Sequence, residues 1–297
     1  MKELIKDVNR NYSNIKIRQI CEVPEKTINT IFIINNSYIL KMYNVDNENQ
    51  IKNSIITQKM ADDKISLAPN IILNNKNELY TVYKDCIYCI QEKIHEEELN
   101  ANIVEIVAKN LAKMHLMFEN LDSSTYKIRK DNKNYEEIFE SIKNTKIKDI
   151  DNTIEKAVNH LLNKRLELLN KYKCSYSPEI FQIIHGDVRL SNIIKQRENA
   201  FFIDFDFVSF SDLLYEIGSS AMLISNFNIK EAKRFIEIYN KSAKKNIKEK
   251  DIMNNLISYY IQSSFPLRLI GKIESKQVEK MMNDRIRALE FCDKYFN

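Results

Sequence analysis

The sequence predicts an α+β protein of two lobes, in which an antiparallel sheet precedes a mainly helical part. Strand-like runs separated by turns continue to residue 92, and apolar residues then recur at the three- and four-residue spacing of helices. The length of 297 residues fits one large domain or a pair of lobes. We therefore predict an N-terminal lobe over residues 1–92 and a C-terminal lobe over residues 93–297.

Five strands and one helix are expected in the N-terminal lobe. Residues 30–34 and 37–43 flank two asparagines, which tolerate a positive φ, and this pattern predicts a β-hairpin. Residues 47–63 lack helix breakers and carry apolar residues at helical spacing, which predicts a helix. Pro69 then precedes three further strand-like runs, at residues 71–73, 78–83 and 86–92.

The C-terminal lobe is expected to be mainly helical, because its apolar residues follow a 3.6-residue period over long stretches. This period is most regular from Val104 to Phe118. Residues 181–208 interrupt it with short strand-like runs. Further helices are predicted at residues 148–172, 212–226, 230–243, 250–264 and 275–294.

Charge and apolar runs exclude several classes of partner. The net charge is only +4, and the densest basic run, residues 241–250, is more typical of a solvated helix end than of a nucleic-acid site. No apolar run approaches the roughly 18 residues of a membrane-spanning helix, and the first residues lack the apolar segment of a secretory signal. Five scattered cysteines favour reduced thiols in a cytoplasm. We expect no nucleic-acid or membrane partner, and a monomer or homodimer.

Glycine is rare, with only Gly186, Gly218 and Gly271 in the whole chain. The phosphate-binding loops of dinucleotide-binding enzymes and of P-loop NTPases need several glycines close together, because their backbone must approach the phosphates. The sequence therefore excludes both classes.

The residues best suited to carry chemistry lie in one segment of the interrupted region. His185-Gly186-Asp187 is followed by Asn192, and Ile203-Asp204-Phe205-Asp206 comes after a hairpin predicted from residues 193–195 and 200–203. In that hairpin Lys195 lies opposite Ala200, and Asn192 therefore lies opposite Ile203. Asn192 and Asp204 should then meet at the open end of the hairpin. Their oxygens suit a Mg²⁺ ion that carries the phosphates of a nucleotide.

This pattern resembles the catalytic and metal-binding loops of the aminoglycoside phosphotransferase and choline kinase superfamily, small-molecule kinases with a protein-kinase-like fold. Similar features run in the expected order from about residue 25 to residue 220. Tyr38-Ile39-Leu40-Lys41 is similar to the kinase strand that carries the ATP lysine. Residues 111–115 and 213–218 resemble two helices of the family, with Glu216 in place of the usual aspartate.

The resemblance implies a role for each matching residue. Asp187 would be the catalytic base that orients the acceptor hydroxyl, and Lys41 would bind the α- and β-phosphates. Asn192 and Asp204 would hold Mg²⁺. Asp206 is a further metal candidate for a second ion, or it makes a structural hydrogen bond. The implied cofactors are ATP, or another nucleoside triphosphate, and Mg²⁺. The N-terminal lobe would then bind the nucleotide, and the C-terminal lobe would be catalytic and bind the substrate.

Arg189 lies two residues after Asp187, where protein kinases carry the lysine of their catalytic loop. Its guanidinium either faces the transferred phosphate, which would make Arg189 a catalytic residue, or turns outward or pairs with a structural carboxylate such as Glu216.

Two features depart from the family pattern. The loop expected to cover the nucleotide, residues 24–30, contains no glycine, which leaves Thr27 and Asn29 as the predicted donors to the nucleotide. The helix at residues 47–63 offers no convincing glutamate to pair with Lys41. Either Glu48 serves, or Lys41 is held in another way.

The predicted function is that of an ATP- and Mg²⁺-dependent kinase acting on a hydroxyl of a small metabolite. The acceptor classes considered are an amino alcohol, a hydroxy amino acid, a sugar and an aminoglycoside. The net charge of +4 argues mildly against a polycationic acceptor. The alternative is a catalytically inactive binding or structural protein that resembles the spore-coat members of the superfamily. Asp187, Asn192 and Asp204 together favour the kinase.

Overall fold

The computed structural model describes residues 1–24, 29–98, 102–128, 137, 139–140, 143, 152–172, 180–263, 267, 270–271 and 274–296. The chain forms two compact units. The first comprises Met1–Ile128 with Gln182–Phe210, and the second comprises Arg129–Phe181 with Ser211–Asn297. Every site residue predicted above falls within the residue ranges of the first unit, and Thr27 alone lies outside the described residues. The lobe boundary between residues 92 and 93 stays a prediction.

An antiparallel sheet of six strands forms the centre of the first unit, in the order β1-β2-β3-β6-β4 with β5 also paired to β6. In the β2–β3 hairpin, Asn35 and Asn36 have φ values of 52° and 56°, as the predicted turn requires. The α+β class is confirmed. The strands are β1 (Ile20–Glu22), β2 (Thr30–Ile34), β3 (Tyr38–Asn44), β4 (Ile71–Ile72), β5 (Thr81–Tyr83) and β6 (Cys86–Glu92).

The prediction of five strands and one helix is wrong in both numbers. The sixth strand, β1, has three residues, of which two are exposed, so no alternation of apolar and polar residues marks it. The additional helix is α1 (Lys2–Asn11). Its apolar residues lie at helical spacing among charged ones, but no helix is predicted for this segment above.

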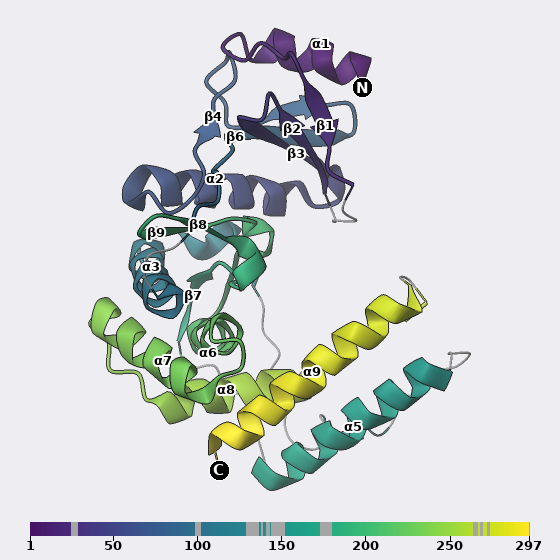
Figure 1. The fold of residues 1–297 in the computed structure, drawn as a ribbon, viewed down its shortest axis with the longest axis vertical. Helices are drawn as coiled ribbons and strands as arrows, with labels where there is room; N and C mark the ends of the chain where they lie inside the picture. Colours follow the sequence, from purple (N-terminus) through teal and green to yellow (C-terminus); the bar gives the residue numbers. More distant parts are fainter. Residues whose placement is uncertain are drawn as a thin grey trace. The chain divides into compact units, whose positions relative to one another are not determined.

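Two helices cover opposite faces of the sheet (Figure 1). On one face α1 packs Val8 into a core with Leu40 and Tyr88. On the other face α2 (Glu48–Ile65) packs Ile51 and Ile55 against strand residues of β3 and β6. The sheet is therefore the middle layer of three.

The pleat of β3 determines where Lys41 points. Successive side chains of a strand face opposite sides of the sheet. Leu40 belongs to the core under α1, and Tyr43 belongs to the core under α2. Lys41 shares the side of Tyr43, and its register partner on β6, Cys89, lies in the same core. The strand thus carries the lysine to the α2 side of the sheet.

A helix and a short hairpin complete the first unit. α3 (Ile103–Phe118) begins at Asn102, whose side chain accepts a hydrogen bond from the N–H of Val104. β8 (Ile193–Gln196) pairs with β9 (Asn199–Phe202), and Lys195 lies opposite Ala200 as predicted. The N–H of Ile203 donates to the carbonyl of Asn192 at 3.0 Å, which confirms the predicted register at the open end.

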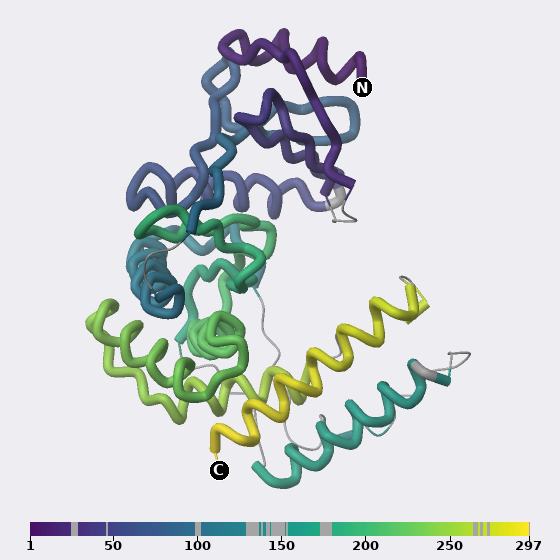
Figure 2. The backbone as a smooth tube through the Cα atoms, viewed as in Figure 1, coloured from purple at the N-terminus to yellow at the C-terminus, as the bar shows by residue number. Residues whose placement is uncertain are grey.

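The second unit consists mainly of helices, and the predicted ones are confirmed with small shifts of their ends. α6 packs against α7 and α8, and α5 lies alongside α9 (Figure 2). Of the helix predicted at residues 148–172, the first four residues lie outside the described residues. The helices are α5 (Asn152–Tyr172), α6 (Leu213–Ile224), α7 (Ile229–Ala243), α8 (Glu249–Gln262) and α9 (Ser275–Phe296). Within the described ranges, no helix combines the length and apolar character needed to cross a membrane.

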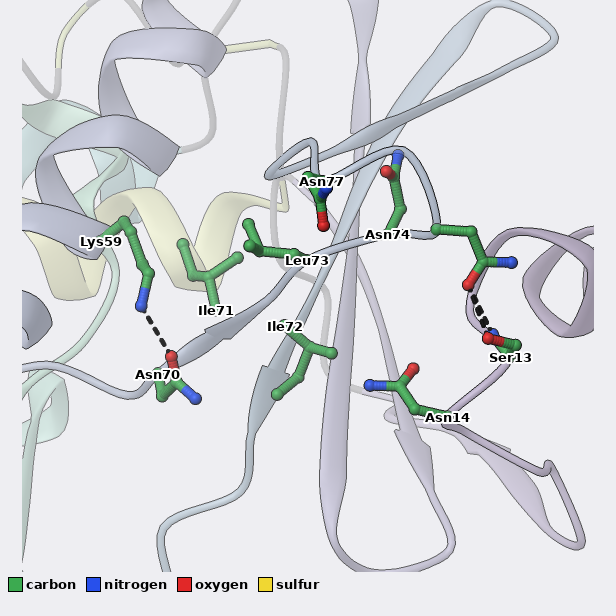
Figure 3. A pocket seen from close by; sticks show the side chains of 10 residues that line it. Ser13, Asn14, Lys59, Asn70, Ile71, Ile72, Leu73, Asn74 and Asn77 are labelled. Carbon is green, nitrogen blue, oxygen red and sulfur yellow. Dashed lines mark hydrogen bonds between the residues drawn. The ribbon is translucent and has the colours of Figure 1, made fainter.

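A hollow of about 520 Å³ lies beside β4, at the edge of the sheet (Figure 3). Asparagines form much of its lining, and two of them accept hydrogen bonds from neighbouring side chains. Lys59 Nζ donates to Asn70 Oδ1 at 2.9 Å, and Ser13 Oγ donates to Asn75 Oδ1 at 2.8 Å. No predicted site residue lines this hollow, so it is separate from the site described below.

Candidate active site

The loop that carries Asp187 is anchored by the histidine before it. β7 (Phe181–Ile184) leads directly into His185, which is completely buried. Its ring centroid lies 4.5 Å from that of Phe205, and its Nδ1 accepts the backbone N–H of Asp187 at 3.3 Å. His185 therefore joins the loop of Asp187 to the loop of Asp204 by packing and by a hydrogen bond.

Gly186 lets the same loop pass close to the chain after Asp204. Its φ is +86°, in the region that favours glycine. A Cβ at this position would lie 2.3 Å from the carbonyl oxygen of Phe207. Both the backbone conformation and the lack of space therefore require glycine.

Gly186→Ala is expected to lower the free energy of unfolding by roughly 2–4 kcal/mol, because a positive φ costs an alanine about 1–2 kcal/mol and the steric overlap adds a similar amount. Chemical denaturation of both proteins measures the difference. Gly271→Ala is the matched control, since Gly271 has a φ of +76° but no atom within 4 Å of the added Cβ. Equal losses in the two variants would show that the contact with Phe207 does not matter.

Two predicted residues, Arg189 and Asn192, donate hydrogen bonds to the carboxylate of Asp187. Arg189 Nη2 donates to Asp187 Oδ2 at 2.6 Å, and Asn192 Nδ2 donates to the same oxygen at 2.8 Å. Asn192 Nδ2 also donates to the backbone carbonyl of Asp187 at 2.9 Å. The guanidinium thus turns back to the Asp187 carboxylate, and the role of Arg189 towards a transferred phosphate stays a prediction. Half of the Arg189 side chain stays exposed, at 51%.

Lys41 lies between the two carboxylates of the second loop. Its Nζ is 2.6 Å from Asp204 Oδ1 and 2.8 Å from Asp206 Oδ1. Asp204 has a left-handed backbone, with φ 65° and ψ 61°, a conformation that costs energy for a residue other than glycine. The 3-10 turn Phe205–Phe207 follows it, with Phe205 buried against His185. Such strain is often kept where a side chain must be aimed at a ligand.

Electrostatics in this trio follow from burial and mutual attraction. Burial disfavours the charged form of Lys41, but the charges of Asp206 and Asp204 outweigh it and raise the pKa of the lysine. Burial also opposes ionisation of Asp204, yet the nearby lysine keeps the pKa of this carboxyl below its usual value. For Asp206, burial and the charge of Asp204 outweigh the lysine and raise the pKa.

The helix α2 reaches this loop through uncharged side chains. Gln50 Nε2 donates to the carbonyls of Asp206 at 3.0 Å and of Val208 at 2.7 Å. Ser54 Oγ donates to Asp206 Oδ1 at 3.4 Å. Glu48 instead pairs with Lys52 at 2.6 Å, so the alternative that Lys41 is held in another way is confirmed.

Of the two predicted nucleotide donors, the structure describes only one. Asn29 Nδ2 donates to Asp206 Oδ2 at 2.5 Å, which brings the end of the 24–30 segment to the loop of Asp204 and Asp206. Thr27 lies outside the described residues. Sequence reasoning missed Gln50 and Ser54, although their i, i+4 spacing puts them on one face of α2.

The donor set fits a hard divalent cation. Asn192 uses its amide nitrogen for both bonds to Asp187, so its Oδ1 is the atom of this side chain that would bind a cation. Among the described residues, no three His, Cys, Asp or Glu side chains form a metal site. Mg²⁺ typically binds one or two carboxylates together with the phosphates of a substrate, which agrees with so sparse a set.

Several known proteins are similar to this chain. The chain is 24% identical over 227 residues to "Protein LicA homolog" of Metamycoplasma hominis, which covers 74% of this chain and 80% of that protein. Among solved structures, a spectinomycin phosphotransferase in complex with ADP and spectinomycin is similar over all of this chain and 94% of its own, with 17% identity and a TM-score of 0.64. An amicoumacin kinase in complex with AMP-PNP and Ca²⁺ is similar over 99% and 93%, with 14% identity and a TM-score of 0.63.

The conserved sequence pattern of one protein family matches most of this chain. It matches residues 20–249, which include Lys41, the loop of Asp187 and the loop of Asp204. The predicted superfamily is thereby confirmed, as is its implication of a small-molecule phosphotransferase with a kinase-like fold. The chain belongs to the phosphotransferase enzyme family.

Proposed function

We propose that this phosphotransferase is an ATP- and Mg²⁺-dependent kinase that transfers the γ-phosphoryl group to a hydroxyl of a small metabolite. The observation that carries the proposal is the convergence of Arg189 and Asn192 on Asp187, next to a loop in which Asp204 contacts Lys41. Phosphoryl transfer depends on positioning and on charge neutralisation more than on covalent help, and these groups can supply both.

Asp187 is the proposed base and orienter of the acceptor hydroxyl. Its Oδ2 is held by two donors, so the carboxylate has a fixed direction. The acceptor hydroxyl would donate its hydrogen bond to this carboxylate and lose its proton there as the new P–O bond forms. The backbone N–H of Asp187, bonded to His185, fixes the loop from the opposite side.

Lys41, Asn192 and Asp204 are the proposed nucleotide and metal residues. Bound Mg²⁺ would neutralise charge on the phosphates. Asn192 Oδ1 and the Asp204 carboxylate would hold the ion, and the Lys41 ammonium would bind the α- and β-phosphate oxygens. The similar solved structures were obtained with ADP or AMP-PNP, and one of them with Ca²⁺, which supports a nucleotide and a divalent cation here.

The acceptor is proposed to be a small hydroxylated molecule: an amino alcohol, a hydroxy amino acid, a sugar or an aminoglycoside. The spectinomycin and amicoumacin enzymes support a small-molecule acceptor, since both are kinases or phosphotransferases of such compounds. The cytoplasmic location predicted from the cysteines stays part of the proposal.

Two measurements on the purified protein test the proposal. Mg²⁺–ATP should raise the melting temperature more than ATP with EDTA does, because Asp204 binds the nucleotide only through the cation. ADP release should then be measured across a panel of amino alcohols, hydroxy amino acids, sugars and aminoglycosides. A protein that is not stabilised by Mg²⁺–ATP would support the inactive binding protein instead.

Arg189→Ala is expected to lower turnover by roughly 10²-fold with little change in nucleotide affinity, because a guanidinium beside Asp187 can neutralise charge on the transferred phosphoryl group. Steady-state kinetics of the variant and of Arg189→Lys, which should recover part of the loss, measure this effect. Arg197→Ala is the matched control, since that arginine is 81% exposed and pairs with Glu97. A lower melting temperature with parental turnover would make Arg189 a structural clamp.

A further inference from the structure

We infer that Asp206 is the counter-ion that positions Lys41, and that α2 supports this carboxylate with neutral donors in place of a helix glutamate. The inference deepens the proposed function and rests on it where Asp204 is taken as the metal ligand, whereas the ion pair of Asp206 with Lys41 is observed independently of that function. It assigns Asp206 to the lysine instead of to a second metal ion.

The first step concerns the charge that Lys41 needs. The lysine side chain is only 12% exposed, and a buried cation is stable only beside a carboxylate with good geometry. Asp204 and Asp206 both supply one, at 2.6 and 2.8 Å. In the proposed function Asp204 is committed to the metal. Asp206 is then the carboxylate that remains for the lysine.

The second step concerns the oxygens of Asp206, which already have donors. Oδ1 accepts from Lys41 and from Ser54, and Oδ2 accepts from Asn29. The backbone carbonyl of the same residue accepts from Gln50. Three elements distant in sequence therefore hold the carboxylate in one orientation, directed at the lysine. A ligand for a second metal ion would need an oxygen turned away from these donors.

The third step concerns α2, which places uncharged groups where a helix carboxylate would act. Gln50 and Ser54 lie one turn apart on the same face, and Ser54 is buried, at 2% exposure. A glutamate at position 54 would bring a carboxylate close to the place of Asp206 Oδ1, since Ser54 Oγ lies 3.4 Å from that oxygen. The negative charge thus comes from the metal loop itself, and the helix contributes hydrogen bonds alone. Lys41 therefore receives its counter-ion, Asp206, from the same loop that carries the proposed metal ligand Asp204.

Thermal unfolding in EDTA tests the assignment without turnover. Asp206→Asn should lower the melting temperature by roughly 3–8 °C, because Lys41 loses one of its two carboxylates. A melting temperature of Asp206→Asn equal to or above that of the parent would overturn the assignment, because it would show that Asp206 does not stabilise the buried Lys41.

Relocation of the charge gives the decisive comparison. Asp206→Asn combined with Ser54→Glu returns a carboxylate to Lys41 from the helix, and it should recover at least half of the lost melting temperature. The matched control is Asp206→Asn with Ser54→Gln, which has the same size and no charge and should recover nothing. Equal behaviour of the Glu and Gln double variants would overturn the inference.

Kinetics add a readout that a merely structural residue would not change. Asp206→Asn should lower kcat by about 10–100-fold with the acceptor KM unchanged, and the Ser54→Glu double variant should recover part of kcat. The parent separates the two proposals. If the parent neither binds Mg²⁺–ATP nor turns over, the proposed function fails while the EDTA comparison still decides the role of Asp206. If the parent is active but Asp206→Asn melts at the parental temperature or above, only the counter-ion role fails.

Discussion

Asp187→Asn is expected to lower turnover by about 10²–10⁴-fold, the usual effect of losing a positioned base. The amide keeps an oxygen that can accept from Arg189 and Asn192, which donate to Asp187 at 2.6 and 2.8 Å, so the loop should keep its shape. What it loses is the ability to take the proton of the acceptor hydroxyl. Steady-state kinetics with the best acceptor found in the panel would measure the loss.

Calorimetry with Mg²⁺ and a non-hydrolysable ATP analogue provides the control for this variant. Its affinity for the analogue should stay within a few-fold of the parent, because no described interaction joins Asp187 to Lys41, and an asparagine at position 187 can still accept the hydrogen bond of Asn192. Activity within threefold of the parent would remove Asp187 from the catalytic role. Loss of both affinity and folding would show that the substitution disturbs the loop, and Asp187→Glu would then be the next variant.

Asp204→Ala should abolish Mg²⁺-dependent nucleotide binding, since it deletes the charged ligand of the cation. Asn192→Ala should weaken binding less, because it removes a neutral ligand. Without metal, Asp204→Ala should have little further effect on nucleotide binding, because Lys41 stays paired with Asp206 at 2.8 Å. Isothermal titration with the ATP analogue, in Mg²⁺ and in EDTA, measures both contributions.

The EDTA titration is the internal control for the metal variants. Weak metal-independent binding should be similar in the parent and in Asp204→Ala if Lys41 alone contacts the phosphates under these conditions. Parental affinity of Asp204→Ala for the Mg²⁺ complex would contradict the assignment of this residue as a metal ligand. A larger loss for Asn192→Ala than for Asp204→Ala would reverse their ranking.

Local patterns predicted the parts of the fold that local physics determines. The Asn-Asn turn fixed the β2–β3 hairpin, because two adjacent residues with positive φ specify its geometry. Lys41 then faces the α2 side of the sheet through the two-residue period of the strand. The register of Lys195 with Ala200 followed from the short turn between the strands of its hairpin.

The support of Lys41 could not be predicted in the same way. Its partner Asp206 lies 165 positions further along the chain, and Ser54 and Gln50 are neutral residues that no charge pattern identifies. A search of α2 for a carboxylate finds Glu48, which the structure pairs with Lys52 on the same helix. Contacts of this kind appear only once the sheet, the helix and the loop are packed together.

The three-layered arrangement of the first unit has a consequence for where the domain begins. The family pattern starts at residue 20, after α1. Leu4 and Val8 are almost fully buried against the sheet, and Asp7 accepts the hydroxyl of Tyr88 at 2.9 Å. A chain shortened to the family limits would leave Leu40 and Tyr88 in a bare apolar face open to self-association. The unit that folds is therefore longer than the region that the family pattern covers, because α1 forms one of the two layers that cover the sheet.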